Sequence, residues 1–173
     1  MSNITLVTYA SRAGSTAGVA QAVAHTLKDR GIAVEVCPMR DVQDITRYRA
    51  VVAGSAVRMS QWLPEGMAFV EHHRQQLLQK PFAAFVVCLA MAAKSEKGLE
   101  KVTAAAYLQP VRTLVPTVSE GLFAGVLDLS KLPLMYRIPF RLATLSGIFK
   151  EGDYRDWNTI HQWANDLLPK LVV

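Results

Sequence analysis

The segment Ile4–Thr16, ITLVTYASRAGST, carries more information about the fold than any other part of the chain. Its first half is a run of apolar, β-branched and aromatic residues, which predicts a buried strand. Its second half, Ser11–Thr16, is a loop of small and hydroxyl residues where a helix should begin. First-turn amides lack intrahelical acceptors and the helix dipole is positive there, so this junction can bind an anion. Gly14 lets the backbone come close to a bound group.

Two interpretations of the loop Ser11–Thr16 stay open at this point. Serine and threonine are common N-cap residues, so the loop can serve only to start a helix. The other interpretation is a bound anion, and the spacing limits which one. The GxxxxGK(S/T) pattern of nucleoside triphosphate sites and the GxGxxG pattern of dinucleotide sites are both absent from the sequence. A loop with several hydroxyls and no lysine suits one terminal monophosphate better.

The composition is that of a folded protein with a positive charge. Of the 173 residues, 51% are hydrophobic, which argues against disorder, and we expect a single domain over residues 1–173. The net charge of +5 favours anionic partners. Cys37 and Cys88 lie in apolar runs without disulfide or metal spacing, which favours free thiols in a cytoplasmic protein. No signal-peptide pattern and no apolar run of about 18 residues occurs, so we expect no membrane-spanning segment.

Strand and helix patterns alternate after the loop. Apolar runs predict further strands at residues 33–37, 50–54, 82–89 and 122–127. Helical spacing of apolar residues predicts helices at residues 17–30, 64–78, 99–114 and 157–168. In the second of these helices, His72, His73 and Arg74 are expected on the outer face. Residues 42–48 predict a weak helix or a turn.

Five strands that alternate with helices predict an open α/β sheet of parallel strands covered on both faces. We expect the order 2-1-3-4-5, in which the segments after the first, third and fourth strands meet at one edge. These segments are the loop Ser11–Thr16, residues 55–62 and residues 90–97. A long insertion, residues 129–152, follows the fifth strand.

With these features the chain resembles the flavodoxin-like family, a three-layer sandwich, over nearly its whole length. That family binds FMN through a phosphate loop of the form (S/T)-x-T-G-x-(S/T). Ser11, Gly14 and Thr16 match it, whereas Ala13 replaces a hydroxyl residue and keeps only its backbone N–H. The phosphate-binding residues implied by this resemblance are Ser11, Arg12, Ala13, Gly14, Ser15 and Thr16.

In the family, the segments after the third and fourth strands enclose the flavin ring. The residues that this implies are Ser55, Ala56, Val57, Arg58, Met59 and Trp62 after the third strand, and Leu89, Ala90, Met91 and Ala92 after the fourth. Trp62 can stack on the ring or pack against the core, and Met59 can contact the flavin or fill a gap in the core. Arg58 can contact substrate or flavin, or form a structural ion pair.

Within the family, the chain resembles the menaquinone-dependent protoporphyrinogen dehydrogenase type. The likeness rests on Gly54–Arg58, on the insertion at residues 129–152, and on Asp153–Trp157 (DYRDW) before the last helix. It implies an FMN-dependent oxidoreductase that acts on protoporphyrinogen, or on another hydrophobic or quinone-like substrate, with a quinone as acceptor. Because the flavin carries the chemistry, no catalytic acid or base is implied.

The insertion is amphipathic and basic. One helical face holds Met135, Ile138, Leu142, Leu145 and Phe149, despite Pro139. The flanking basic residues are Lys131, Arg137, Arg141 and Lys150, and no acid lies among them. Residues 131–150 therefore suit a peripheral contact with an anionic membrane, on the inner face of the cell membrane, or a hydrophobic substrate. A helix docked on the sheet and a homodimer interface are the alternatives.

Other functional classes stay open or are disfavoured. A flavodoxin-type electron carrier has no small-molecule substrate of its own, but such carriers are usually acidic, unlike this chain. A scaffold that has lost its flavin is a third reading, which Ala13 keeps open. No metal site is expected, because adjacent His72 and His73 point apart on a helix and the other histidines lack partners at ligand spacing. We expect no nucleic-acid partner, because the excess charge is spread out and no recognised module is present.

Overall fold

A parallel sheet forms the centre of the protein. The computed structural model describes residues 3–92, 98–131, 134–145 and 150–172. The strands run in the order β2-β1-β3-β5-β6. They are β1 (Ile4–Ala10), β2 (Ala33–Pro38), β3 (Ala50–Arg58), β5 (Phe82–Val87) and β6 (Ser119–Phe123). Counted along the chain these five strands have the order 2-1-3-4-5, so the predicted flavodoxin-like sheet is confirmed.

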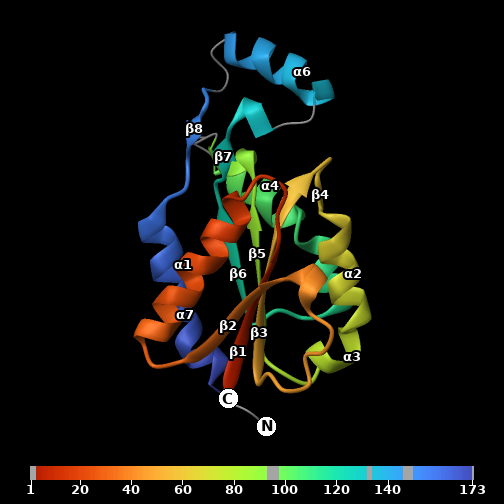
Figure 1. Ribbon diagram of the computed structural model, residues 1–173, viewed down its shortest axis with the longest axis vertical. Helices are drawn as coiled ribbons and strands as arrows, with labels where there is room; N and C mark the ends of the chain where they lie inside the picture. The colour runs from red at the N-terminus through yellow and green to blue at the C-terminus, as the bar shows by residue number, and fades with distance from the viewer. Residues whose placement is uncertain (1–2, 93–97, 132–133, 146–149, 173) are drawn as a thin grey trace.

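Helices cover both faces of the sheet (Figure 1). On one face lie α1 (Ser15–Asp29) and α7 (Trp157–Leu171), which pack side by side. On the other lie α2 (Pro64–His72), α3 (Arg74–Leu77), α4 (Leu99–Ala106) and α5 (Gln109–Leu114). The apolar stripe of α1, Val19, Val23 and Leu27, is fully buried against the sheet, as helical spacing predicts.

Two helices that the sequence predicts as continuous are broken. The predicted helix over residues 99–114 divides into α4 and α5, with Pro110 in the first turn of α5, because proline is accepted at a helix start but not in its interior. The predicted helix over residues 64–78 divides at His73, between α2 and α3. The break turns the His73 ring inward against Phe69, and His73 is only 4% exposed. The prediction that His73 lies outside is wrong.

Two strand ends also differ from the prediction. The third strand continues to Arg58 and turns back into β4 (Gln61–Trp62), so residues 55–62 form a hairpin and not a loop. The predicted fifth strand is interrupted after Phe123. Its last part, β7 (Val126–Leu127), leaves the sheet and pairs antiparallel with β8 (Gly152–Asp153).

The insertion projects from the end of the molecule where β7 and β8 lie (Figure 1). It contains η3 (Leu129–Lys131) and α6 (Leu134–Leu145). The apolar residues Met135, Ile138, Leu142 and Leu145 are 62–84% exposed, so the alternative of a helix docked on the sheet is wrong. Phe149 lies outside the described residues. None of the described helices is both long and apolar enough to cross a membrane.

Candidate functional site

Three strand ends meet at one edge of the sheet. Ala10, at the end of β1, lies beside Ser55 in β3, and Ser55 lies beside Val86 in β5. The chain segments that follow these strands therefore leave the sheet close together, as a doubly wound fold requires. They are the loop Ser11–Thr16, the β3–β4 hairpin and the short helix η2 (Leu89–Ala92).

The loop between β1 and α1 turns at Gly14. Gly14 has a φ of 90°, in the left-handed region that residues with a side chain rarely adopt. Its N–H donates a hydrogen bond of 3.1 Å to Oγ of Ser11, which closes the loop. No side chain caps α1, and the first turn of α1 contains no acidic residue. The amides and the positive dipole end of α1 are therefore available to an anion.

Thr16, in the first turn of α1, carries a polar atom that lacks a partner. The residue is fully buried, and its Oγ1 makes no hydrogen bond within the described part of the chain. A buried hydroxyl without a partner costs about 1–3 kcal/mol. A phosphate oxygen seated in the loop would accept this hydrogen bond. The turn at Gly14, the uncapped helix and the Thr16 hydroxyl together fit a phosphate group.

Arg12 extends from the loop to α2. Its Nη2 lies 2.9 Å from Oε2 of Glu65, in the first turn of α2. The side chains are 61% and 30% exposed, respectively, so the ion pair is largely solvated. The sequence did not predict this partner. Its only signal was an acid after Pro64 at a helix start, which is an ordinary place for glutamate.

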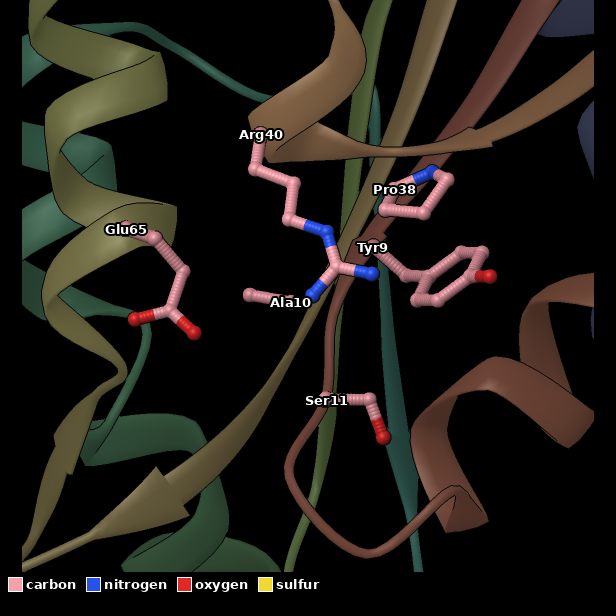
Figure 2. A pocket seen from close by; sticks show the side chains of 6 residues that line it. All are labelled: Tyr9, Ala10, Ser11, Pro38, Arg40 and Glu65. Atoms are coloured by element: carbon pink, nitrogen blue, oxygen red, sulfur yellow. The ribbon is translucent and has the colours of Figure 1, made fainter.

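A small hollow lies beside the loop (Figure 2). It is lined by Tyr9, Ala10, Ser11, Pro38, Arg40 and Glu65. Arg40 belongs to the short helix η1 (Met39–Asp41), and Figure 2 shows its guanidinium reaching past Ala10 into the space between Glu65 and Tyr9. The hollow measures about 80 Å³. It is far smaller than ligand pockets of about 300–1,000 Å³, so its size suits a phosphate group but not a whole cofactor.

The β3–β4 hairpin contains the residues that were predicted to contact the flavin ring after the third strand. Some of them face the core. Ser55 is fully buried. Its Oγ donates to the carbonyl of Ala56 (2.8 Å) and accepts from the N–H of Leu63 (3.0 Å). These hydrogen bonds use the hydroxyl for the hairpin itself, so the Ser55 side chain is not placed to bind a cofactor. Ala56 and Val57 are partly buried and pack against the core.

The tip of the hairpin projects beyond the sheet. Met59 and Ser60 have φ values of 50° and 61°, as a two-residue hairpin turn requires, although asparagine and glycine are the usual residues there. Met59 is 82% exposed, so the alternative that it fills a gap in the core is wrong. Arg58 is also exposed. Residues in this unfavourable conformation cluster at functional sites, which keeps the tip a candidate contact for a ligand.

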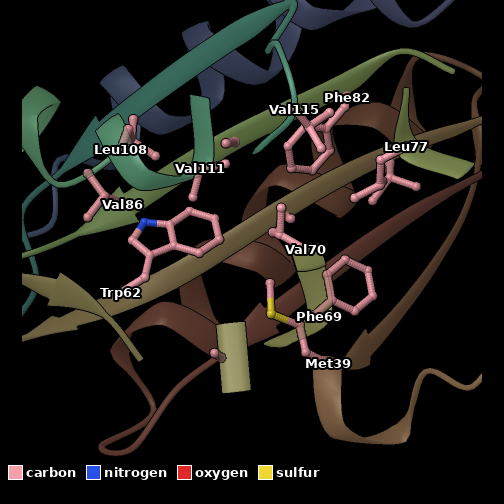
Figure 3. Packing of buried hydrophobic residues seen from close by; sticks show 14 of the residues in the cluster. Met39, Trp62, Phe69, Val70, Leu77, Phe82, Val86, Leu108, Val111 and Val115 are labelled. Carbon is pink, nitrogen blue, oxygen red and sulfur yellow. The ribbon is translucent and has the colours of Figure 1, made fainter. Parts of the chain in front are cut away.

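Trp62 does not lie on the ligand side of the hairpin. Its ring is 2% exposed and packs in the core beside Val86 and Val111 (Figure 3). Side chains alternate along a strand, and in β4 Gln61 faces solvent while Trp62 faces inward. The predicted stacking of Trp62 on a flavin is therefore wrong, and the alternative of packing against the core holds.

The third segment follows β5. The short helix η2, which holds Leu89, Ala90, Met91 and Ala92, is partly buried, and Ala90 and Met91 pack against the core cluster. Each of the four residues thus keeps part of its surface at the strand ends. The rest of the predicted segment, residues 93–97, lies outside the described residues.

No second reactive centre accompanies this site in the described residues. Cys37 and Cys88 are free thiols, and burial raises the pKa of both, which disfavours the reactive thiolate. No group of three or more histidine, cysteine, aspartate or glutamate residues that could hold a metal ion occurs in the part of the chain that is described.

Comparison with protein-family models shows the family to which this chain belongs. A model described as a flavodoxin domain matches residues 6–147, from β1 through the insertion helix. The chain belongs to the flavodoxin domain family. Comparison with curated proteins gives no match. The loop Ser11–Thr16, the hairpin and η2 all lie inside the matched flavodoxin domain.

Solved structures with the flavodoxin fold match nearly the whole chain. The flavodoxin of Streptococcus pneumoniae TIGR4 is 16% identical with a TM-score of 0.59, and the match covers 96% of this chain and 99% of that one. A flavo di-iron protein of Thermotoga maritima is 14% identical with a TM-score of 0.61, and the match covers 99% of this chain and 36% of that one. The rubredoxin oxygen:oxidoreductase of Desulfovibrio gigas is 18% identical with a TM-score of 0.50, with coverages of 99% and 38%. At these identities the matches show the fold alone, and this chain spans only part of the two larger proteins.

Proposed function

We propose that this flavodoxin-domain protein binds FMN and is a redox protein. The observation that carries the proposal is the loop Ser11–Thr16, whose turn, uncapped helix and unpaired Thr16 hydroxyl fit a phosphate. Ala13 would contribute its backbone N–H alone. Arg58 and Met59 of the hairpin and residues 89–92 are the candidates to flank the flavin ring. Bound FMN supplies one- and two-electron chemistry, and the protein supplies binding and orientation.

A flavin titration tests this proposal. Apoprotein is titrated with FMN and, separately, with riboflavin, and the fluorescence of the flavin is followed. We expect both to be quenched and FMN to bind more tightly, because only FMN carries the phosphate that the loop Ser11–Thr16 would hold. Unchanged fluorescence of both flavins at micromolar concentrations would exclude a flavin function.

For the electron partner, we propose a hydrophobic or quinone-like substrate, with protoporphyrinogen as donor and a quinone as acceptor. Support comes from the exposed apolar face of α6, which lies at the same end of the molecule as the carboxyl ends of the strands (Figure 1). Met59, at the tip of the hairpin, adds an exposed apolar side chain at that end. A hydrophobic substrate would meet apolar surface on its way to the site.

We also propose that residues 131–150 contact an anionic membrane. An exposed apolar helix face with basic flanks and no acid is the pattern of an interfacial helix. Co-sedimentation with phosphatidylglycerol vesicles tests this contact, with phosphatidylcholine vesicles for comparison. Binding to the anionic vesicles should drop for Arg141→Glu/Lys150→Glu. It should persist for Lys28→Glu/Arg30→Glu, which changes the charge equally at the far end of α1. Equal binding of both variants would rule out the contact.

The second candidate function is electron transfer between proteins, without a small-molecule substrate. The match to the Streptococcus pneumoniae flavodoxin over almost the full length of both chains favours it. Anaerobic mixing of the FMN-loaded protein with protoporphyrinogen separates the two functions. Bleaching of the oxidised flavin spectrum, followed by reoxidation with a menaquinone analogue, supports the enzyme. A flavin that stays oxidised with protoporphyrinogen but is reduced by a reductase protein supports the carrier.

A further inference from the structure

Arg12 is paired with a carboxylate, although it belongs to the loop that we propose binds a phosphate. It belongs to the loop Ser11–Thr16, but its guanidinium is turned to α2 and held by one contact, Nη2 to Oε2 of Glu65 at 2.9 Å. In the described part of the chain, no other hydrogen bond or ion pair holds this guanidinium. Its remaining N–H donors can therefore serve another acceptor.

A second guanidinium lines the same hollow as Glu65. In Figure 2 the guanidinium of Arg40 lies between Glu65 and Tyr9, and its ion-pair partner is Asp41 at 3.8 Å. The positive end of the α1 dipole lies on the other side of the loop, with no acid in its first turn. Glu65 is thus the acid that faces a concentration of positive charge, and it lines the hollow together with Ser11.

The Arg12–Glu65 pair is weak enough to exchange. Both side chains reach solvent, and exposed ion pairs of a single contact contribute little to stability. A phosphate carries up to two charges and accepts paired hydrogen bonds from arginine, which makes it the stronger partner for the same guanidinium. Exchange of Glu65 for a phosphate would also place the cation beside the Gly14 turn.

We propose that Glu65 competes with the phosphate of the ligand for Arg12, and that this competition sets how strongly the protein prefers phosphorylated over unphosphorylated flavins. The inference rests on the proposed FMN function and deepens it. Arg12 is one of the residues that bind the phosphate. Glu65 acts through Arg12 and holds it in the absence of the phosphate.

A double-mutant cycle tests the competition. The variants are Arg12→Gln, Glu65→Gln and their combination. Two controls make the same charge changes on exposed residues: Arg30→Gln at the C-terminal end of α1, and Glu71→Gln within α2. Affinities for FMN and riboflavin are measured by fluorescence, and urea unfolding verifies that each variant is folded.

The expected changes are specific for FMN. Arg12→Gln should weaken FMN binding about tenfold, the size of a charged hydrogen bond, and leave riboflavin unchanged. Glu65→Gln should strengthen FMN binding by about two- to fivefold, the size of an exposed ion pair. In the Arg12→Gln background, Glu65→Gln should give no gain. Both controls should bind like the parent protein.

The outcomes that overturn the competition are distinct from those that overturn FMN binding. If Glu65→Gln does not strengthen FMN binding, or strengthens it as much without Arg12, the competition is refuted while the FMN function stands. If no flavin binds, the FMN function fails. Inorganic phosphate then tests the exchange alone, because it should raise the melting temperature more in Glu65→Gln than in the parent protein and less in Arg12→Gln. An equal rise in all three proteins would refute the exchange.

Discussion

The ring of Phe85 in β5 lies directly against Gly54 in β3. The two residues are register partners in the sheet, and a Cβ added to Gly54 would come within 1.9 Å of Cζ of Phe85. Phe123 and Trp163 surround the same ring, with centroid distances of 6.0 and 5.9 Å, so it has little room to move. The Phe85 ring therefore occupies the space of a side chain at position 54, one residue before Ser55, where the site begins.

Gly54→Ala should therefore destabilise the protein. The added methyl must displace a packed aromatic ring, and overpacking of a core costs about 1–3 kcal/mol, so we expect a loss of about 2 kcal/mol in the free energy of unfolding. Urea unfolding measures it. Gly152→Ala, where an added Cβ meets no atom within 4 Å, should change stability by less than about 0.5 kcal/mol. Phe85→Leu should recover part of the loss in the Gly54→Ala background. A Gly54→Ala protein as stable as the parent would contradict the observed packing.

The unpaired hydroxyl of Thr16 allows stability and cofactor affinity to be separated. Thr16→Val keeps the shape and removes a buried hydroxyl without a partner, so the apoprotein should be as stable as the parent or more stable. FMN binding should weaken by about tenfold, because a hydrogen bond to a charged phosphate is lost. Urea unfolding and fluorescence titration give the two values.

Thr5 in β1 provides a matched control for Thr16. It is also fully buried, and its Oγ1 also lacks a partner, but it lies at the opposite end of β1 from the loop. Thr5→Val should show the same effect on stability and none on FMN affinity. If both variants bind FMN like the parent, the Thr16 hydroxyl does not contact the phosphate.

The sheet and its site edge were predictable because they depend on local patterns. Residues 50–54 are apolar throughout, as a strand covered on both faces must be, and a glycine-containing loop followed by an apolar stripe marks the start of α1. The hairpin was not predictable, because its tip, Met59 and Ser60, lacks the asparagine or glycine that signals a two-residue turn. That turn decides which way Trp62 points.

Contacts between distant segments were the other part that local patterns could not reveal. Arg12 and Glu65 are 53 positions apart, and neither residue carries a local signal of the other. In the sequence, Gly54 could indicate an interruption of the strand. In the structure, glycine is required there because the Phe85 ring of the neighbouring strand occupies the space of a side chain. The position of α6 likewise depends on β7 leaving the sheet to pair with β8, which an apolar run over residues 122–127 does not indicate.

His73 should make stability depend on pH. It is packed against Phe69 at a ring distance of 4.8 Å, and burial lowers its pKa from the ordinary value of 6.5. The unfolded chain then takes up the proton at a higher pH than the folded one. Stability therefore falls as pH drops below about 6.5 and stops falling only below the folded pKa.

His73→Gln should reduce this pH dependence, whatever its effect on stability at neutral pH. Urea unfolding at about pH 7.5 and about pH 5.5, on either side of the ordinary histidine pKa, gives the difference to be compared. His72→Gln, an exposed neighbour whose ring lies 4.6 Å from that of His73, should reduce the pH dependence less than His73→Gln does. A His73→Gln protein with the same pH dependence as the parent would show that another group is responsible.

The apolar face of α6 should contribute almost nothing to the stability of the isolated protein. Leu142 is 62% exposed, whereas Leu167 in α7 is fully buried against the sheet. Leu142→Ala should change the free energy of unfolding by less than about 0.5 kcal/mol, because little area is lost and alanine favours a helix. Leu167→Ala should cost about 2–5 kcal/mol, as expected for a core leucine. The two variants make the same chemical change in helices, so urea unfolding compares burial alone.

A loss for Leu142→Ala close to that for Leu167→Ala, constant over a wide range of protein concentration, would mean that α6 packs on its own chain. A loss that appears only at high protein concentration would instead point to a second copy on this face.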